Sequence, residues 1–90
     1  MKAVHAVVTG RVQGVTYRHA TRTAARGLGL VGWVRNLPDG RVEVWAQGDD
    51  DGVTKLVDWL WLGPAGAVVM SVESDVVAID QSIRDFFIRQ

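Results

Sequence analysis

The chain has 90 residues, enough for one domain and too few for two, and 48% of them are hydrophobic, which favours a packed core and excludes a disordered protein. The absence of cysteine excludes disulfides and thiolate chemistry and is typical of a reducing compartment. Net charge is zero, but residues 1–48 hold seven basic and two acidic side chains, whereas residues 49–90 hold three basic and eight acidic ones. This asymmetry either averages out in the fold or marks a local anion site in the first half.

The apolar stretches are too short and too charged for a membrane span. Residues 1–10 also lack the longer apolar run and the small-residue cleavage site of a signal peptide. We therefore expect a single cytoplasmic domain over residues 1–90, with no membrane partner. No interface stripe is obvious, so a monomer is the default expectation.

The first half of the chain predicts a strand, a connection and a helix. Residues 3–9 are rich in Val and Thr, as strands are, and residues 10–16 form a glycine-bearing connection. Residues 17–28 are rich in Ala and Arg and predict a helix. Its expected apolar face consists of Tyr17, Ala20, Ala24 and Leu28.

A hairpin follows, with strands at 31–36 and 41–47 joined by a Pro-Asp-Gly turn. Alternation places Val34 and Asn36 on one face of the first strand. Trp33 and Trp45 should lie on the other face of the sheet as cross-strand neighbours, either packed there or serving as a stacking platform. The inward face of the second strand should consist of Val42, Val44 and Ala46.

The second half predicts a helix at 49–61, a long strand at 67–78 and a short last strand at 84–89. The order β-α-β-β-α-β, with the last strand free to join an edge, predicts an α+β fold. Its expected architecture is the ferredoxin-like split βαβ sandwich, in which two helices cover one face of an antiparallel sheet. The other face is then open to solvent.

The stretch GRVQGVTYR, residues 10–18, connects the first strand to the first helix. A glycine-bearing loop at a helix N-terminus can turn several unpaired main-chain N–H groups toward one anion. Arg18, in the first turn, adds a planar fork of donors that suits a phosphoryl group. On the loop alone, an ordinary turn with a surface arginine remains an open alternative.

Two blocks of sequence make the interpretation specific. GRVQGVTYR resembles the acylphosphatase signature G-x-V-Q-G-V-x-[FY]-R, and residues 29–48, GLVGWVRNLPDGRVEVWAQG, are similar to the second signature of that family, G-x-V-x-N followed by D-G and V-E. The resemblance covers essentially the whole chain. It implies hydrolysis of small carboxylic acyl phosphates to a carboxylate and inorganic phosphate, without metal or cofactor.

The resemblance also implies a division of roles. Asn36 would orient the attacking water, and the Arg18 side chain would bind the phosphate. Inorganic phosphate or sulfate would then also bind as a ligand of the site. The rest of the phosphate cradle would be the main-chain amides of Gln13, Gly14, Val15, Thr16, Tyr17 and Arg18.

Two other classes of protein compete with a hydrolase. RNA-recognition modules share the element order and would use Trp33 and Trp45 to stack on bases. The third strand, however, lacks the basic-Gly-aromatic pattern of these modules, and the pI of the chain is near 6.7. We therefore expect no nucleic-acid partner. A module that only captures an anion would leave Asn36 without a task. The sequence offers no convincing cluster of metal ligands: His5 and His19 are isolated, and we interpret both as structural or solvent-facing.

Overall fold

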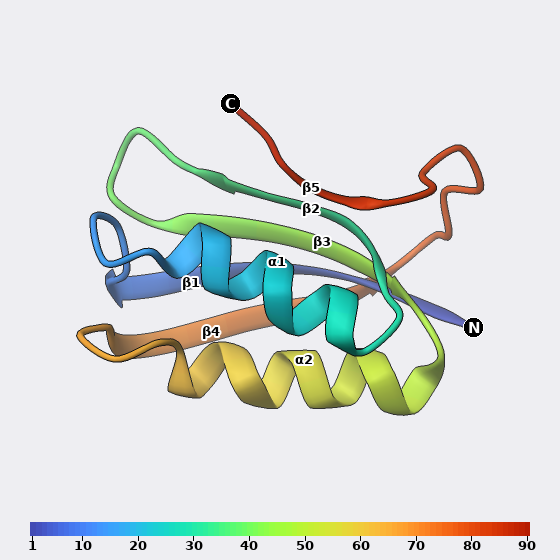
Figure 1. Cartoon of the computed structure of the whole chain (residues 1–90), viewed down its shortest axis with the longest axis horizontal. Coiled ribbons are helices and arrows are strands. Elements are labelled where there is room, and N and C mark those ends of the chain that lie inside the picture. The colour runs from blue at the N-terminus through green and yellow to red at the C-terminus, as the bar shows by residue number, and fades with distance from the viewer.

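The computed structural model describes residues 1–90, and its elements match the predicted ones to within a residue or two at each end (Figure 1). The elements, in chain order, are β1 (Lys2–Arg11), α1 (Tyr17–Gly27), β2 (Val31–Asn36), β3 (Val42–Gly48), α2 (Asp50–Leu62), β4 (Val68–Val77) and β5 (Phe86–Ile88).

The five strands form one sheet in the order β4-β1-β3-β2-β5, and both helices cover the same face of it (Figure 1). The pairs β1–β3, β1–β4 and β2–β3 are antiparallel, which confirms the ferredoxin-like sandwich. β5 joins the free edge of β2 in parallel, so the complete sheet is mixed. The chain reaches that edge from β4, at the opposite edge, through residues 78–85.

The core lies between the sheet and the two helices. The hairpin register pairs Trp33 with Trp45 and Val34 with Val44, as the alternation predicts. The buried residues that form one continuous cluster include Val8, Val34, Val42, Val44, Ala46, Val53, Leu56, Leu60 and Phe86. This single cluster fixes the positions of β1, β2 and α1 relative to one another, and those elements carry the site described below.

The buried face of α1 differs from the predicted one. Its buried residues are Tyr17, Thr21 and Ala25, at i, i+4 and i+8, whereas Ala20 and Ala24 are only partly buried. Burial of the polar Thr21 is possible because its hydroxyl donates a hydrogen bond of 2.8 Å to the carbonyl of Tyr17. Hydrophobicity alone therefore placed the apolar face one residue away from its real position.

The sheet face opposite the helices carries a polar network. Glu43 accepts hydrogen bonds from His5, at 2.6 Å, and from the Arg35 guanidinium. Partial burial pushes the pKa of Glu43 upward, but the two hydrogen bonds outweigh burial and hold the pKa below its ordinary value. Trp33 packs against the guanidinium groups of Arg35 and Arg89, which lie 5.7 and 4.7 Å from its ring centre.

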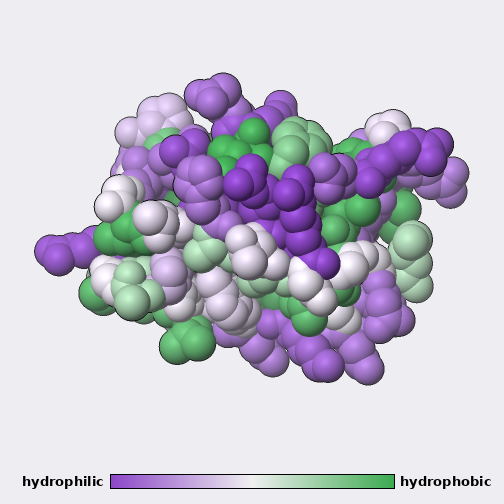
Figure 2. All heavy atoms as spheres, in the orientation of Figure 1, coloured by the Kyte–Doolittle hydropathy of each residue, from purple (hydrophilic) through white to green (hydrophobic).

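The surface is mixed in character. Figure 2 shows hydrophilic side chains around much of the molecule, with hydrophobic ones scattered in small groups between them. The most exposed large hydrophobic side chains include Leu62 at the end of α2 and Met70 and Val76 on the edge strand β4. Neither helix has the length and apolar character that crossing a membrane requires.

Candidate active site

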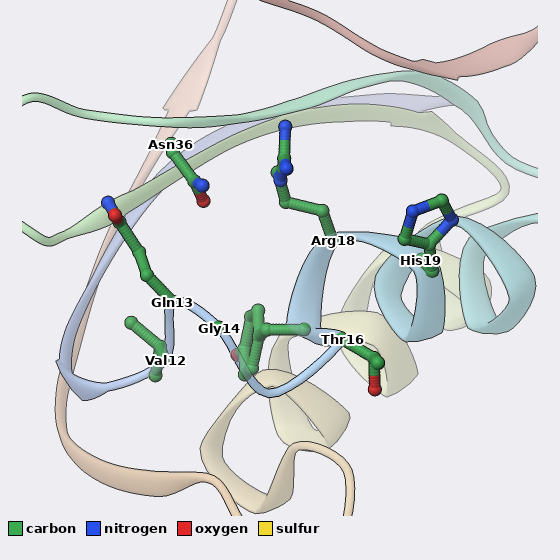
Figure 3. Close-up of a pocket in the computed structure, with 8 residues that line it drawn as sticks. Val12, Gln13, Gly14, Thr16, Arg18, His19 and Asn36 are labelled. Atoms are coloured by element: carbon green, nitrogen blue, oxygen red, sulfur yellow. The ribbon is translucent and has the colours of Figure 1, made fainter.

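A cavity of about 270 Å³ opens where β1 ends, α1 begins and β2 ends (Figure 3). The β1–α1 loop forms its floor, and the last residue of β2 faces it from the sheet. Its lining residues are Val12, Gln13, Gly14, Thr16, Tyr17, Arg18, His19 and Asn36. The fold thus brings Asn36 next to the loop, although more than fifteen residues separate them in sequence.

The loop between β1 and α1 has an irregular backbone with two residues in the left-handed region. Gly14 has φ 75° and Thr16 has φ 60°, both in the left-handed region, and Thr16 is the sole non-glycine residue with positive φ. None of the main-chain N–H groups from Gln13 to His19 donates a hydrogen bond within the protein, and α1 has no side-chain cap. These donors, together with the positive end of the α1 dipole, favour a bound anion.

Arg18 and Asn36 point into the space above the loop (Figure 3). The Arg18 side chain is half-buried and forms no ion pair, and no carboxylate lines the cavity, so its positive charge is uncompensated. The Oδ1 atom of Asn36 is buried without any hydrogen-bond partner. A buried acceptor without a partner is rare in proteins.

The model of the acylphosphatase family matches residues 4–88. The chain belongs to this family. A curated acylphosphatase of Acaryochloris marina is 52% identical over 81 residues, which cover 90% of this chain and 83% of that protein. The family's activity, hydrolysis of acyl phosphates, is therefore the activity of this enzyme.

Solved structures of acylphosphatases superpose on the whole chain. The Coxiella burnetii acylphosphatase has a TM-score of 0.94 at 40% identity, covering 98% of this chain and 92% of its own. The Bacillus subtilis acylphosphatase has a TM-score of 0.96 at 30% identity and covers both chains completely. These matches confirm the ferredoxin-like fold predicted from the order of elements.

Tyr17 anchors the start of α1, and with it the acylphosphatase cavity, to α2. Its hydroxyl donates a buried hydrogen bond of 2.6 Å to the carbonyl of Leu60, and its ring lies 5.8 Å from that of Trp59. Burial raises the pKa of the Tyr17 phenol, which therefore stays neutral. The side chain thus belongs to the core, and the same residue lines the cavity at the start of α1.

Among the predicted cradle residues, Val15 does not line the cavity, because its side chain turns to the core and packs there. Val12 and His19 do line it, and sequence reasoning assigned neither to the site. His19 is exposed, and its Nδ1 lies 3.3 Å from an Arg22 nitrogen, as its solvent-facing interpretation predicts. It borders the cavity all the same, beside Arg18 in the first turn of α1.

The chain contains no group of three or more His, Asp or Glu residues arranged to hold a metal ion. The three acidic residues 49–51 lie at the start of α2, and none of them lines the cavity. The lining offers instead main-chain N–H donors, the Arg18 guanidinium and the side-chain amides of Gln13 and Asn36, and N–H donors and guanidinium groups are suited to binding phosphoryl oxygens.

Proposed function

We propose that this cavity hydrolyses small carboxylic acyl phosphates by orientation and charge stabilisation alone, without a metal ion. The main-chain amides from Gln13 to Arg18 and the Arg18 guanidinium bind the phosphoryl group, and Asn36 holds the attacking water. The position of the Asn36 side chain carries the proposal, because it lines the same cavity as Arg18 and the main-chain N–H groups of the loop, which have no partner within the protein.

Charge development in the reaction suits these donors. Phosphoryl transfer passes through a loose transition state whose negative charge is spread over the equatorial oxygens. Donors fixed by the loop need no rearrangement as this charge develops, which makes them effective stabilisers. The leaving carboxylate has a conjugate acid of pKa about 4, so it departs without a proton and needs no general acid.

During the attack, the proton that the water loses stays within the site. The water oxygen forms a new bond to phosphorus as the bond from phosphorus to the acyl oxygen breaks, and the electron pair leaves with the carboxylate. The Oδ1 of Asn36 accepts a hydrogen bond from the water and thereby directs a lone pair of the water oxygen at phosphorus. The amide is too weak a base to take the proton of the water. That proton passes to a phosphoryl oxygen, which makes the step substrate-assisted.

The test is hydrolysis of benzoyl phosphate by Asn36→Ala in the presence of EDTA, with Gln81→Ala as the control. Gln81 is an exposed amide on the loop between β4 and β5, away from the cavity. We expect Asn36→Ala to lower kcat by on the order of 10²-fold, with little change in inhibition by phosphate, because orientation of the reactants is lost and the cradle is kept. Gln81→Ala should match the wild type.

Two results would contradict the proposal. If Asn36→Ala loses phosphate binding but keeps kcat, Asn36 binds the anion rather than the water. Wild-type activity that disappears with EDTA and returns with added metal would remove the metal-free mechanism.

The cytoplasmic location and the monomeric state remain predictions. The absence of cysteine supports the first. Light scattering of the purified chain at several concentrations tests the second, with a constant mass near 9.8 kDa expected.

A further inference from the structure

The side chain of Gln13 makes contacts that a cradle built of main-chain amides does not require. Its Nε2 donates one hydrogen bond of 2.8 Å to the carbonyl of Leu37 and another of 2.9 Å to the carbonyl of Arg41. Both acceptors lie in the β2–β3 turn, between Asn36 at the end of β2 and Val42 at the start of β3. Figure 3 shows this side chain rising from the loop toward the strands, on the side where Asn36 lies.

The two carbonyls also close the β2–β3 turn. Leu37 N–H donates to the Arg41 carbonyl at 2.8 Å, and Gly40 N–H donates to the Leu37 carbonyl at 3.2 Å. Each carbonyl therefore uses one lone pair within the turn and the other for Gln13. Because Leu37 follows Asn36 directly, one amide nitrogen connects the phosphate loop to the residue next to the proposed water ligand.

We propose that the Gln13 side chain is a positioning residue, which fixes the distance between the phosphate cradle and Asn36. This inference rests on the proposed function, since it requires that Asn36 acts on the attacking water. Its action is indirect: the loop is held on one side by β1 and α1, and the Gln13 amide ties its middle to the end of β2. A displacement of about 1 Å between cradle and water is enough to reduce turnover by around 10²-fold.

The required side chain is narrowly defined. It must present two N–H donors on one atom at the reach of a glutamine, and it must bring no negative charge to a phosphate site. Asparagine is one methylene shorter, and methionine has the same length but no donor. Both substitutions should therefore break the connection while leaving the main-chain amide of residue 13 in place.

The chain offers a matched control at the other end of β3. Gln47 donates from Nε2 to the Asp80 carbonyl at 2.7 Å and accepts from Asp80 N–H at 2.9 Å through Oε1. It thereby holds the loop after β4 just as Gln13 holds the β2–β3 turn, but it does not line the active-site cavity. Gln47→Met removes a comparable pair of hydrogen bonds, in a more buried setting, without touching the cradle.

The experiment is a double-mutant cycle in benzoyl phosphate hydrolysis with Gln13→Met, Asn36→Ala and the double variant. We expect Gln13→Met to lower kcat by about tenfold or more, with phosphate inhibition changed much less. In the Asn36→Ala background, the same substitution should lower kcat by less than about twofold, because the residue that it positions is gone. Gln47→Met should lower the unfolding midpoint and keep kcat, and Gln13→Asn repeats the test should Gln13→Met fold poorly.

The outcomes separate the two proposals. Should Asn36→Ala leave kcat unchanged, the water-placing role itself is wrong. Should Asn36→Ala lower kcat while Gln13→Met has no effect, or has an effect of the same size in both backgrounds, only the positioning role of Gln13 is wrong. Equal losses of kcat in Gln13→Met and Gln47→Met would also overturn it, because destabilisation alone would then explain both.

Discussion

Substitution of Gly63, which ends α2, should disturb the active site from a distance. Gly63 has φ 66° and ψ −177°, a conformation nearly restricted to glycine, and an added Cβ would lie 2.8 Å from Cε2 of Tyr17 and 3.1 Å from the Cβ of Ala67. The conformation costs alanine about 1–3 kcal/mol, and overpacking adds about 1–3 kcal/mol. We therefore expect Gly63→Ala to reduce the free energy of unfolding by about 2–6 kcal/mol.

The matched control is Gly29→Ala. Gly29 has a similar φ of 72°, but an added Cβ there meets no atom within 4 Å. Only conformational strain then remains, which costs about 1–2 kcal/mol. The difference between the two variants therefore reports mainly the contacts of the added Cβ with the Tyr17 ring and with Ala67.

Urea unfolding followed by tryptophan fluorescence measures both variants, and Trp59, beside Tyr17, is a suitable reporter. Gly63→Ala should also lower kcat of the folded enzyme, because displacement of the Tyr17 ring shifts the first turn of α1. Unfolding of Gly63→Ala at the same urea concentration as Gly29→Ala would show that the added Cβ is accommodated without displacing Tyr17.

Two further predictions concern charge. Arg18→Gln should lower kcat/KM for benzoyl phosphate by at least about 10³-fold and weaken phosphate inhibition, because it removes the uncompensated guanidinium from the cavity. A folded variant with unchanged turnover would contradict the assignment of Arg18 to the phosphate-binding site. The interactions of Glu43 in the folded protein hold its pKa below the ordinary value of 4.5. Its ion pairs therefore stabilise the fold above pH 4.5, and this stabilisation is lost as the pH falls through the lower pKa of the folded state. Urea midpoints measured from pH 6 to pH 3 should therefore fall less steeply in Glu43→Gln than in the wild type, and parallel curves would show that Glu43 is not the responsible group.

Local patterns were enough to predict most of the fold. The Pro-Asp-Gly turn between two alternating stretches fixed the β2–β3 register, and that register placed Trp33 opposite Trp45. The parallel pairing of β5 was not predictable, because a three-residue strand carries no signal of direction. The shift of the α1 face to Thr21 was equally hidden, since it depends on a hydroxyl that finds an acceptor only within the folded helix.

The candidate site shows the same division. Gln13, Gly14, Thr16, Tyr17, Arg18 and Asn36 come together around one cavity, as the two sequence blocks predict. The side-chain contact from Gln13 to the β2–β3 turn was not foreseen, because it joins residues 24 and 28 positions apart, and no local pattern encodes such a contact. Main-chain N–H donors also cannot be recognised from residue types, so only the motif that shapes their loop is visible in the sequence.

The most direct test of the account is a phosphate titration of the ¹⁵N-labelled enzyme, followed by NMR of the main-chain amides with EDTA present. We expect the amide signals from Gln13 to Arg18 to shift most, in a saturable manner, and we expect Arg18→Gln to weaken phosphate binding. Shifts that spread over the surface, or that gather at another end of the sheet while these amides stay unmoved, would contradict it.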